Sequence, residues 1–403
     1  MFDTPSFVWL LLPLGIALGW VLSSRMRGVF GQDPTTASST SWARSSTAKA
    51  AQAAAGSVVD EALDTLDRVG QADPDIYEIQ MILGASLRTR GAVDRAIGVH
   101  ERLVAAAVRA LDDPDSEARA KAASRVDAAR FELARDFVKA GLMDRAENLL
   151  EDLCRRGVMQ SSALELLLSV HEQARAWEQA DTTARQLQSI AGKDFRPRRA
   201  HYFCEIAEQA LAEGDMDAAA SHARHALEIF SKSPRARLLV GDLAEKQGDL
   251  RAALRVWQRV PRQNPRFFPE VLPRLARVCQ MLGETREYRE YIDEAARDYP
   301  AAASVMLERA RLIGAEGGDV AAYLVGKLAG NLHWSGLLAW VEAQCVSQPD
   351  ATDLAALRDA LRKHLEAMPS YRCTACGLTS NLLFWQCPGC KHWDTVAPDN
   401  DSA

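Results

Sequence analysis

Apolar residues recur at helical spacing from about residue 57 to residue 365. The breaks between the periodic stretches fall at glycine and proline, and strand-like alternation of apolar and polar positions does not mark them. This pattern favours helices joined by short turns. We therefore expect an all-α body over residues 57–365.

A longer period runs through the same region. The segments "RGAVDRAIGVHERL" (90–103) and "AGLMDRAENLLEDL" (140–153) share Gly-x-x-Asp-Arg-Ala, and partial copies of this frame follow. The position that opens the second helix of each unit recurs every 34 to 39 residues, at Ala146, Ala180, Ala219, Ala253 and Tyr288. This spacing matches the 34-residue period of tetratricopeptide repeats. A glycine would end each first helix in a left-handed turn, and the alanine would allow close helix packing.

The repeat that begins at Pro234 follows the pattern most closely, with Gly241, Ala253 and Trp257 at or near expected positions. Ala96 and Ala146 lie 50 residues apart, so extra residues there should lengthen a helix or a loop. Stacked helix pairs predict a superhelical solenoid whose concave face is an extended binding surface. The alternative is a solenoid that serves only as a spacer.

The amino-terminal segment carries an uncharged run, "FVWLLLPLGIALGWVL", over residues 7–22. With its flanking residues it approaches the roughly 20 residues that cross a bilayer. Arg25 and Arg27 follow at once, which predicts a single-pass anchor (1–24) with an external amino terminus and a cytoplasmic body. A buried core helix is the alternative. Residues 25–56 are rich in Ser, Thr and Ala and predict a flexible linker.

Composition and motifs limit the classes of function that this chain can have. A net charge of −6 and a pI near 5.8 argue against nucleic-acid binding. The best basic patch is the run Lys193, Arg196, Arg198 and Arg199, for which an ordinary solvated loop is the alternative. The sequence has no phosphate-binding loop, dinucleotide fingerprint or His-Glu-x-x-His motif. We therefore expect a protein that is not an enzyme.

The eight cysteines divide into two groups. Four occur singly within helical patterns and predict small buried apolar residues, at Cys154, Cys204, Cys279 and Cys345. The other four form two Cys-x-x-Cys pairs separated by ten residues, at Cys373, Cys376, Cys387 and Cys390. Two such pairs can surround one tetrahedral metal ion, and free thiols indicate a reducing compartment.

The paired cysteines define a small metal-binding module over residues 369–398. Gly377 permits the positive φ of a metal-binding turn, and Lys391 holds the matching place after the second pair. About 30 residues cannot bury enough apolar surface to fold alone, so the ion should supply much of the stability. We expect the module to pack against the last helices, around residues 350–368. The spacing leaves iron and zinc open. The residues expected to form an apolar shell around the sulfurs are Tyr371, Leu383, Phe384, Trp385 and Trp393.

The combination of anchor, repeats and terminal "YRCTACG...WQCPGCKHWDTVAP" resembles the lipopolysaccharide assembly protein B family of Gram-negative bacteria, over roughly residues 75–398. The resemblance implies a non-enzymatic inner-membrane adaptor that limits lipopolysaccharide synthesis. It would help the membrane protease FtsH to degrade the UDP-3-O-acyl-N-acetylglucosamine deacetylase and would gather other assembly proteins. It also implies a rubredoxin-type iron site at Cys373, Cys376, Cys387 and Cys390, with zinc as the alternative.

Two other functions remain open at this point. The first is a rubredoxin-type electron carrier, and the second is a general tetratricopeptide scaffold for another membrane assembly pathway. Whether the chain forms a homo-oligomer is also open.

Overall fold

The computed structural model describes residue 65, residues 77–330 and residues 332–398. The predicted anchor (1–24) and linker (25–56) lie outside this part of the chain. No helix within the described part has the length and apolar character needed to cross a bilayer. The chain divides into two compact units, Met1–Asp136 and Phe137–Ala403.

The described part of the first unit is a helical hairpin followed by a long helix. Its elements are α3 (Tyr77–Thr89), α4 (Val93–Arg109), η1 (Ala110–Asp112) and α5 (Ser116–Ala140), which extends past the unit boundary. Leu83, Leu87 and Leu103 are buried between α3 and α4. The 25 residues of α5 account for the long interval between Ala96 and Ala146, so the predicted lengthening takes the form of a helix.

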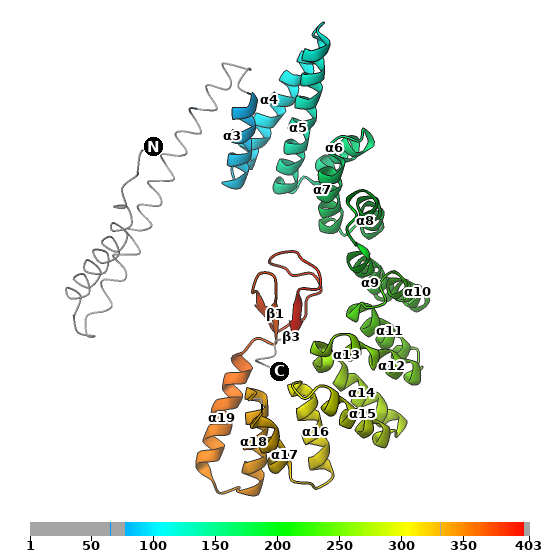
Figure 1. The fold of residues 1–403 in the computed structure, drawn as a ribbon, viewed down its shortest axis with the longest axis vertical. Helices are drawn as coiled ribbons and strands as arrows, with labels where there is room; N and C mark the ends of the chain where they lie inside the picture. The colour runs from blue at the N-terminus through cyan, green and yellow to red at the C-terminus, as the bar shows by residue number, and fades with distance from the viewer. Residues whose placement is uncertain (1–64, 66–76, 331, 399–403) are drawn as a thin grey trace, which may run out of the picture. The chain divides into compact units, whose positions relative to one another are not determined.

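The second unit is a chain-ordered stack of helix pairs, as Figure 1 shows, and consecutive helices pack on one another. Its helices are α6 (Met143–Arg155), α7 (Gln160–Gln173), α8 (Trp177–Ala191), α9 (Arg196–Ala212), α10 (Met216–Ile229), α11 (Pro234–Lys246), α12 (Leu250–Trp257), α13 (Arg259–Gln263), η2 (Pro265–Phe267), α14 (Phe268–Leu282), α15 (Thr285–Asp298), α16 (Ala303–Ala315), α17 (Val320–Leu328), α18 (Trp334–Ser347) and α19 (Thr352–Ala367).

The residues that marked the repeat in the sequence occupy the contacts between helices. All five periodic positions are buried: Ala146, Ala180, Ala219, Ala253 and Tyr288. The glycines of the shared frame adopt left-handed turns, with φ between +78° and +88° at Gly91, Gly141, Gly214 and Gly248. The predicted tetratricopeptide-repeat solenoid is therefore confirmed for the helices that the structure describes.

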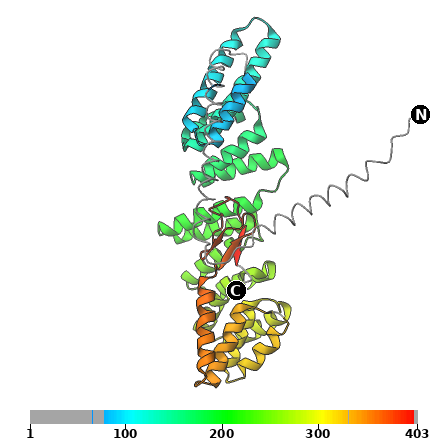
Figure 2. The same cartoon turned by 90° about the vertical axis from the view of Figure 1, so that its left-hand side faces the viewer.

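A small antiparallel sheet follows α19. It consists of β1 (Tyr371–Cys373), β2 (Thr379–Ser380) and β3 (Val396–Pro398) in the order β2-β1-β3. Tyr371 pairs with both Ser380 and Pro398, so β1 is the central strand. In Figure 2 this sheet is drawn in red beside the green helices of the same unit. Residues 371–398, which hold the sheet and all four paired cysteines, are called the knuckle below.

Candidate metal centre and its docking surface

The four paired cysteines converge on one point. Their sulfur atoms all lie within 4.8 Å of one another, and they form the only group of three or more potential metal-ligating side chains in the described part of the chain. Cys373 Sγ lies 3.8 Å from Cys390 Sγ, and Cys376 Sγ lies 3.7 Å from Cys387 Sγ. Metal–sulfur bonds of about 2.3 Å in a tetrahedron place the sulfurs about 3.8 Å apart. The arrangement fits one four-coordinate metal ion and is far too open for disulfide bonds.

Two matching turns hold these sulfurs. In the first, Gly377 N–H donates to Cys373 O, and in the second, Lys391 N–H donates to Cys387 O, each at 2.9 Å. Gly377 has a φ of +76° and Lys391 a φ of +61°, so both positions adopt the left-handed conformation that the sequence predicts. Lys391 adopts it at a steric cost that glycine avoids. The two Cys-x-x-Cys segments are thus near copies of one turn.

Hydrogen bonds favour the thiolate at Cys373, whereas at Cys376 the Leu378 N–H acts to lower the pKa but desolvation and the neighbouring thiols outweigh it and raise the pKa to about 12. Burial acts to raise the pKa of Cys373, but the Thr395 hydroxyl and the backbone N–H groups of Ala375 and Cys376 outweigh it and lower the pKa to about 6. Donors aimed at sulfur stabilise the thiolate, which is the form that binds metal. The local structure is therefore that of a four-cysteine metal-binding knuckle. Both iron and zinc suit such a donor set.

The apolar shell around the sulfurs is smaller than the sequence suggests. Tyr371, Leu383 and Phe384 pack with Cys373, Cys387 and Val396, as expected. For Trp385 and Trp393 the prediction was wrong, because both indole rings pack against helices of the solenoid. The two tryptophans attach the knuckle to the repeats.

Trp393 inserts between α7, α8 and α9. Its indole stacks on His201 at a centroid distance of 4.7 Å and meets Trp177 and Tyr202 edge-on. Its Nε1–H donates to Glu172 Oε1 at 2.9 Å. Polar aromatic rings give both apolar area and a directed hydrogen bond, so this one side chain fixes position as well as proximity.

Glu172 accepts hydrogen bonds from the knuckle and from the helices of the solenoid. Arg198 donates to both of its carboxylate oxygens at 2.6 Å, and the Tyr202 hydroxyl also donates to it. Burial, followed by the nearby Glu172 charge, raises the pKa of Tyr202. Beside this cluster, Asp394 Oδ2 lies 2.8 Å from the buried His201 Nε2, although the angle is outside hydrogen-bond geometry.

A second contact joins the knuckle to η2 and α14. Trp385 stacks on Phe267 with ring centroids 5.6 Å apart, and the Tyr371 hydroxyl donates to Glu270. Arg266 Nη2 donates to Pro398 O at 3.5 Å. The expectation that the knuckle packs on residues 350–368 was therefore wrong. Its aromatic residues find their partners on helices much earlier in the chain.

Sequence reasoning missed the helical half of this docking surface, including Glu172, His201, Phe267 and Glu270. Two signals were present in the sequence. The knuckle has more large aromatic residues than a four-sulfur site needs as an apolar cover, namely Tyr371, Trp385 and Trp393. Glu172 follows His171 in "HEQAR" (171–175), which lacks the second histidine of a His-Glu-x-x-His motif. Neither signal identifies the partner in the other segment.

The predicted basic patch is neutralised within the fold. Each of its four residues lies within 3.6 Å of a carboxylate: Lys193 with Glu165, Arg196 with Asp194, Arg198 with Glu172 and Arg199 with Asp181. These ion pairs argue against a phosphate-binding patch. The alternative of a solvated loop fits only Lys193, because Arg196, Arg198 and Arg199 lie in the first turn of α9. Of the single cysteines, Cys204 and Cys279 are buried, and burial raises their pKa values to about 12 and about 11.

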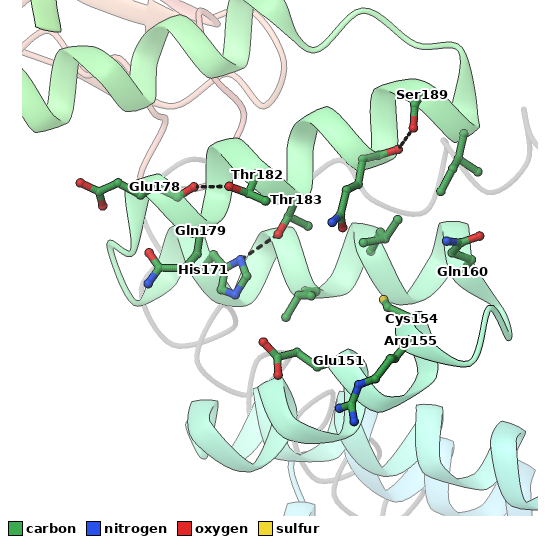
Figure 3. A pocket seen from close by; sticks show the side chains of 14 residues that line it. Glu151, Cys154, Arg155, Gln160, His171, Glu178, Gln179, Thr182, Thr183 and Ser189 are labelled. Carbon is green, nitrogen blue, oxygen red and sulfur yellow. Dashed lines mark hydrogen bonds between the residues drawn. The ribbon is translucent and has the colours of Figure 1, made fainter.

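A separate groove lies between α6, α7 and α8 (Figure 3) and has a volume of about 920 Å³. Gln179 and Thr182 line it from α8, and His171 from α7 hydrogen-bonds with Thr183 Oγ1 at its floor. Its volume lies within the range of ligand-binding pockets. Its amide and hydroxyl groups suit hydrogen bonding to a polar partner.

Comparisons with known proteins agree with this architecture. Residues 371–398 match the family described as "Rubredoxin metal binding domain", and residues 210–278 match the tetratricopeptide repeat family. The chain is 28% identical to lipopolysaccharide assembly protein B of Escherichia coli K12 over 397 residues, which cover 97% of each chain. It is 27% identical to the protein of the same name in Haemophilus influenzae, covering 80% of this chain and 79% of that one. The resemblance to the lipopolysaccharide assembly protein B family is thus confirmed over nearly the whole chain.

Solved structures show local likeness only. A thermophilic tetratricopeptide protein of Thermus thermophilus is 20% identical, with a TM-score of 0.23, and the match covers 51% of this chain and 99% of that one. The MamA protein is 16% identical, with a TM-score of 0.30, and the match covers 48% and 95% of the two chains.

Proposed function

We propose that this protein is a non-enzymatic adaptor in lipopolysaccharide assembly at the bacterial inner membrane. The observation that carries the proposal is the 97% coverage of the Escherichia coli lipopolysaccharide assembly protein B, which spans the repeats and the knuckle together. Helical repeats present long binding surfaces, so their general task is to hold other proteins.

The specific task that we propose is to promote degradation of the UDP-3-O-acyl-N-acetylglucosamine deacetylase by the membrane protease FtsH. The adaptor would bind both proteins and gather other assembly enzymes. Residues 1–24 would anchor it with the amino terminus in the periplasm, residues 25–56 would act as a linker, and the solenoid (57–365) and knuckle (369–398) would lie on the cytoplasmic side.

At the knuckle, we assign the metal ligands to Cys373, Cys376, Cys387 and Cys390. The convergence of their sulfurs supports this assignment. By resemblance to the family the ion is iron, and zinc is the alternative. When bound, it supplies the cross-link that a module of this size needs to stay folded.

Depletion of the protein in its own host tests the adaptor role. We expect the half-life of the deacetylase to lengthen several-fold, because fewer deacetylase molecules would reach the protease. Pulse-chase immunoblotting measures it. Re-expression of the full chain should restore rapid turnover, and an unchanged half-life after depletion would remove the proposal.

A second candidate function is electron transfer, favoured by the solvent-exposed position of Cys376 at the metal site. The same strains separate the two functions. A chain loaded with zinc, which has no redox chemistry, should restore deacetylase turnover if the protein is an adaptor. If only the iron form restores it, the electron-carrier interpretation is the better one.

A further inference from the structure

A group of basic residues is concentrated in the short stretch between α10 and η2. Several arginines of the second unit are paired across helices, as Arg235 is with Glu205 and Arg274 with Asp242. In this group, no carboxylate of the described residues forms an ion pair within 4.0 Å. Its members are Lys232, Arg237, Arg255, Arg259 and Arg262. The group therefore carries positive charge outside the close ion pairs of the fold, and its acidic neighbours at Arg262 are Glu294 and Asp298, which line the same small cavity.

Three of these residues form one line. Arg255, Arg259 and Arg262 follow the spacing i, i+4, i+7 along α12 and α13. Only Gln258 separates the two helices, and its backbone is in the right-handed helical conformation. Residues three and four apart are neighbours on a helix surface, and all three side chains are exposed. We call this line the arginine stripe.

Arg237 of α11 extends the charge sideways. Its Nε–H donates to Gln263 Oε1 at 3.1 Å, one turn beyond Arg259. Partial burial and the nearby Arg259 charge lower the pKa of Arg237. Like charges placed this close repel each other, so an anion beside both would relieve that repulsion.

The surroundings of the stripe limit what it can bind. Among the described residues, no large hydrophobic side chain is exposed between Ile190 and Met281. Stable protein interfaces usually bury an apolar centre, and helices α10 to α13 expose none. The cavity beside Arg262 has a volume of about 30 Å³, too small for an enclosed ligand larger than about one water molecule. The stripe fits an extended anionic surface rather than a small ligand in a pocket.

We propose that the arginine stripe, together with Arg237, holds the repeats against the anionic phospholipid headgroups of a membrane. This rests on the proposed membrane anchor, which would keep the body close to such a surface. Each arginine near an anionic bilayer contributes about a fivefold gain in binding. The attachment is purely electrostatic and is therefore expected to weaken strongly in about 1 M salt, where the Debye length falls to about 3 Å.

Hydrogen exchange on the full chain tests the proposal. The protein is reconstituted into vesicles of phosphatidylcholine alone or of phosphatidylcholine with phosphatidylglycerol, and amide exchange is followed over residues 250–263. We expect slower exchange in the anionic vesicles, reversed in about 1 M salt. The triple variant Arg255→Glu, Arg259→Glu, Arg262→Glu should lose the effect. Single Arg→Gln variants should each lower the ratio of attached to detached body about fivefold.

A matched control carries the same change of charge at exposed helix positions outside the stripe. The variant Arg224→Glu, Arg297→Glu, Lys363→Glu should keep the protection seen in anionic vesicles. Circular dichroism and metal content check that each variant is folded.

Equal exchange in neutral and anionic vesicles would overturn the proposal. So would protection of residues 250–263 that appears only when RNA or poly-glutamate is added to neutral vesicles, since the partner would then be a nucleic acid or an acidic protein. Deacetylase turnover plays no part in this measurement. Failure of the lipid contact therefore leaves the adaptor role untouched, and failure of the adaptor role leaves the lipid contact to be judged separately.

Discussion

Glu172 is the residue at which the knuckle and the repeats meet most closely. The residue is 7% exposed, and its carboxylate accepts hydrogen bonds from Arg198, Tyr202 and Trp393. A buried carboxylate is costly unless it is paired and hydrogen-bonded. Arg198 supplies the opposite charge, and Trp393 of the knuckle supplies a further hydrogen-bond donor. Docking of the knuckle therefore gives the buried carboxylate of Glu172 one of its hydrogen bonds.

A double-mutant cycle measures this contact. Trp393→Phe removes the indole N–H and keeps an aromatic ring, and Glu172→Gln removes the charge and keeps the shape. We expect each to lower the free energy of local opening of residues 385–394 by about 1.5 to 3 kcal/mol, the range for hydrogen bonds to charged groups. Hydrogen exchange measures that opening.

The coupling between the two substitutions is the decisive quantity. We expect about 1 to 2 kcal/mol, because Trp393→Phe removes this hydrogen bond and Glu172→Gln removes the charge that strengthens it. Glu178→Gln, at an exposed carboxylate of α8, is the control and should change the opening by less than about 0.5 kcal/mol. Additive effects at Glu172 and Trp393 would show that the hydrogen bond does not hold the knuckle.

Sequence patterns predicted the backbone conformation of single residues correctly where that conformation has a local cause. The positive φ at Gly377 and Lys391 follows from cysteine spacing and turn chemistry within five residues. The partner of Trp393 could not be predicted in this way, because Glu172 lies 221 residues earlier. A contact of that length depends on how the repeats stack, and a sequence period gives the stacking order without the register of side chains.

At the scale of elements, close approach between paired helices sets the packing. Gly241 in α11 faces the fully buried Trp257 of α12, whose Nε1–H donates to Leu238 O at 3.3 Å. A Cβ at position 241 would lie 2.2 Å from Trp257 Nε1. The period in the sequence placed both residues correctly, because small and large residues at matched repeat positions are a local pattern. It did not show that the two touch.

Gly241→Ala should therefore destabilise the α11–α12 pair by about 1 to 3 kcal/mol, the usual cost of overpacking. Gly326→Ala in α17 is the matched control, since its Cβ would meet nothing within 4 Å. There we expect a gain of up to about 1 kcal/mol from helix propensity. Urea unfolding measures both.

The variant Gly241→Ala, Trp257→Leu tests the cause of the Gly241→Ala defect. Leucine makes room for the new methyl group, so Trp257→Leu should cost less stability in the Gly241→Ala background than in the native background. If the two substitutions simply add, the clash with Trp257 is not the source of the loss.

At the scale of the whole molecule, metal binding and docking depend on each other. The knuckle is too small to stay folded without its cross-link, and Trp393 and Tyr371 reach Glu172 and Glu270 only from a folded knuckle. Loss of the metal should therefore change amide exchange on distant helices.

We expect chelation, or Cys373→Ser with Cys376→Ser, to speed amide exchange across residues 371–398 and also at residues 170–175 and 198–202. Residues 320–328 in α17 serve as the internal control and should exchange unchanged, because the only buried residue of α17, Leu324, belongs to an apolar cluster that the knuckle does not join. Measurement of metal content by mass spectrometry ties the effect to occupancy. Fast exchange confined to the knuckle, with α7 and α9 unaffected, would mean that the solenoid holds its inner contacts without the knuckle and that the ion stabilises its own module alone.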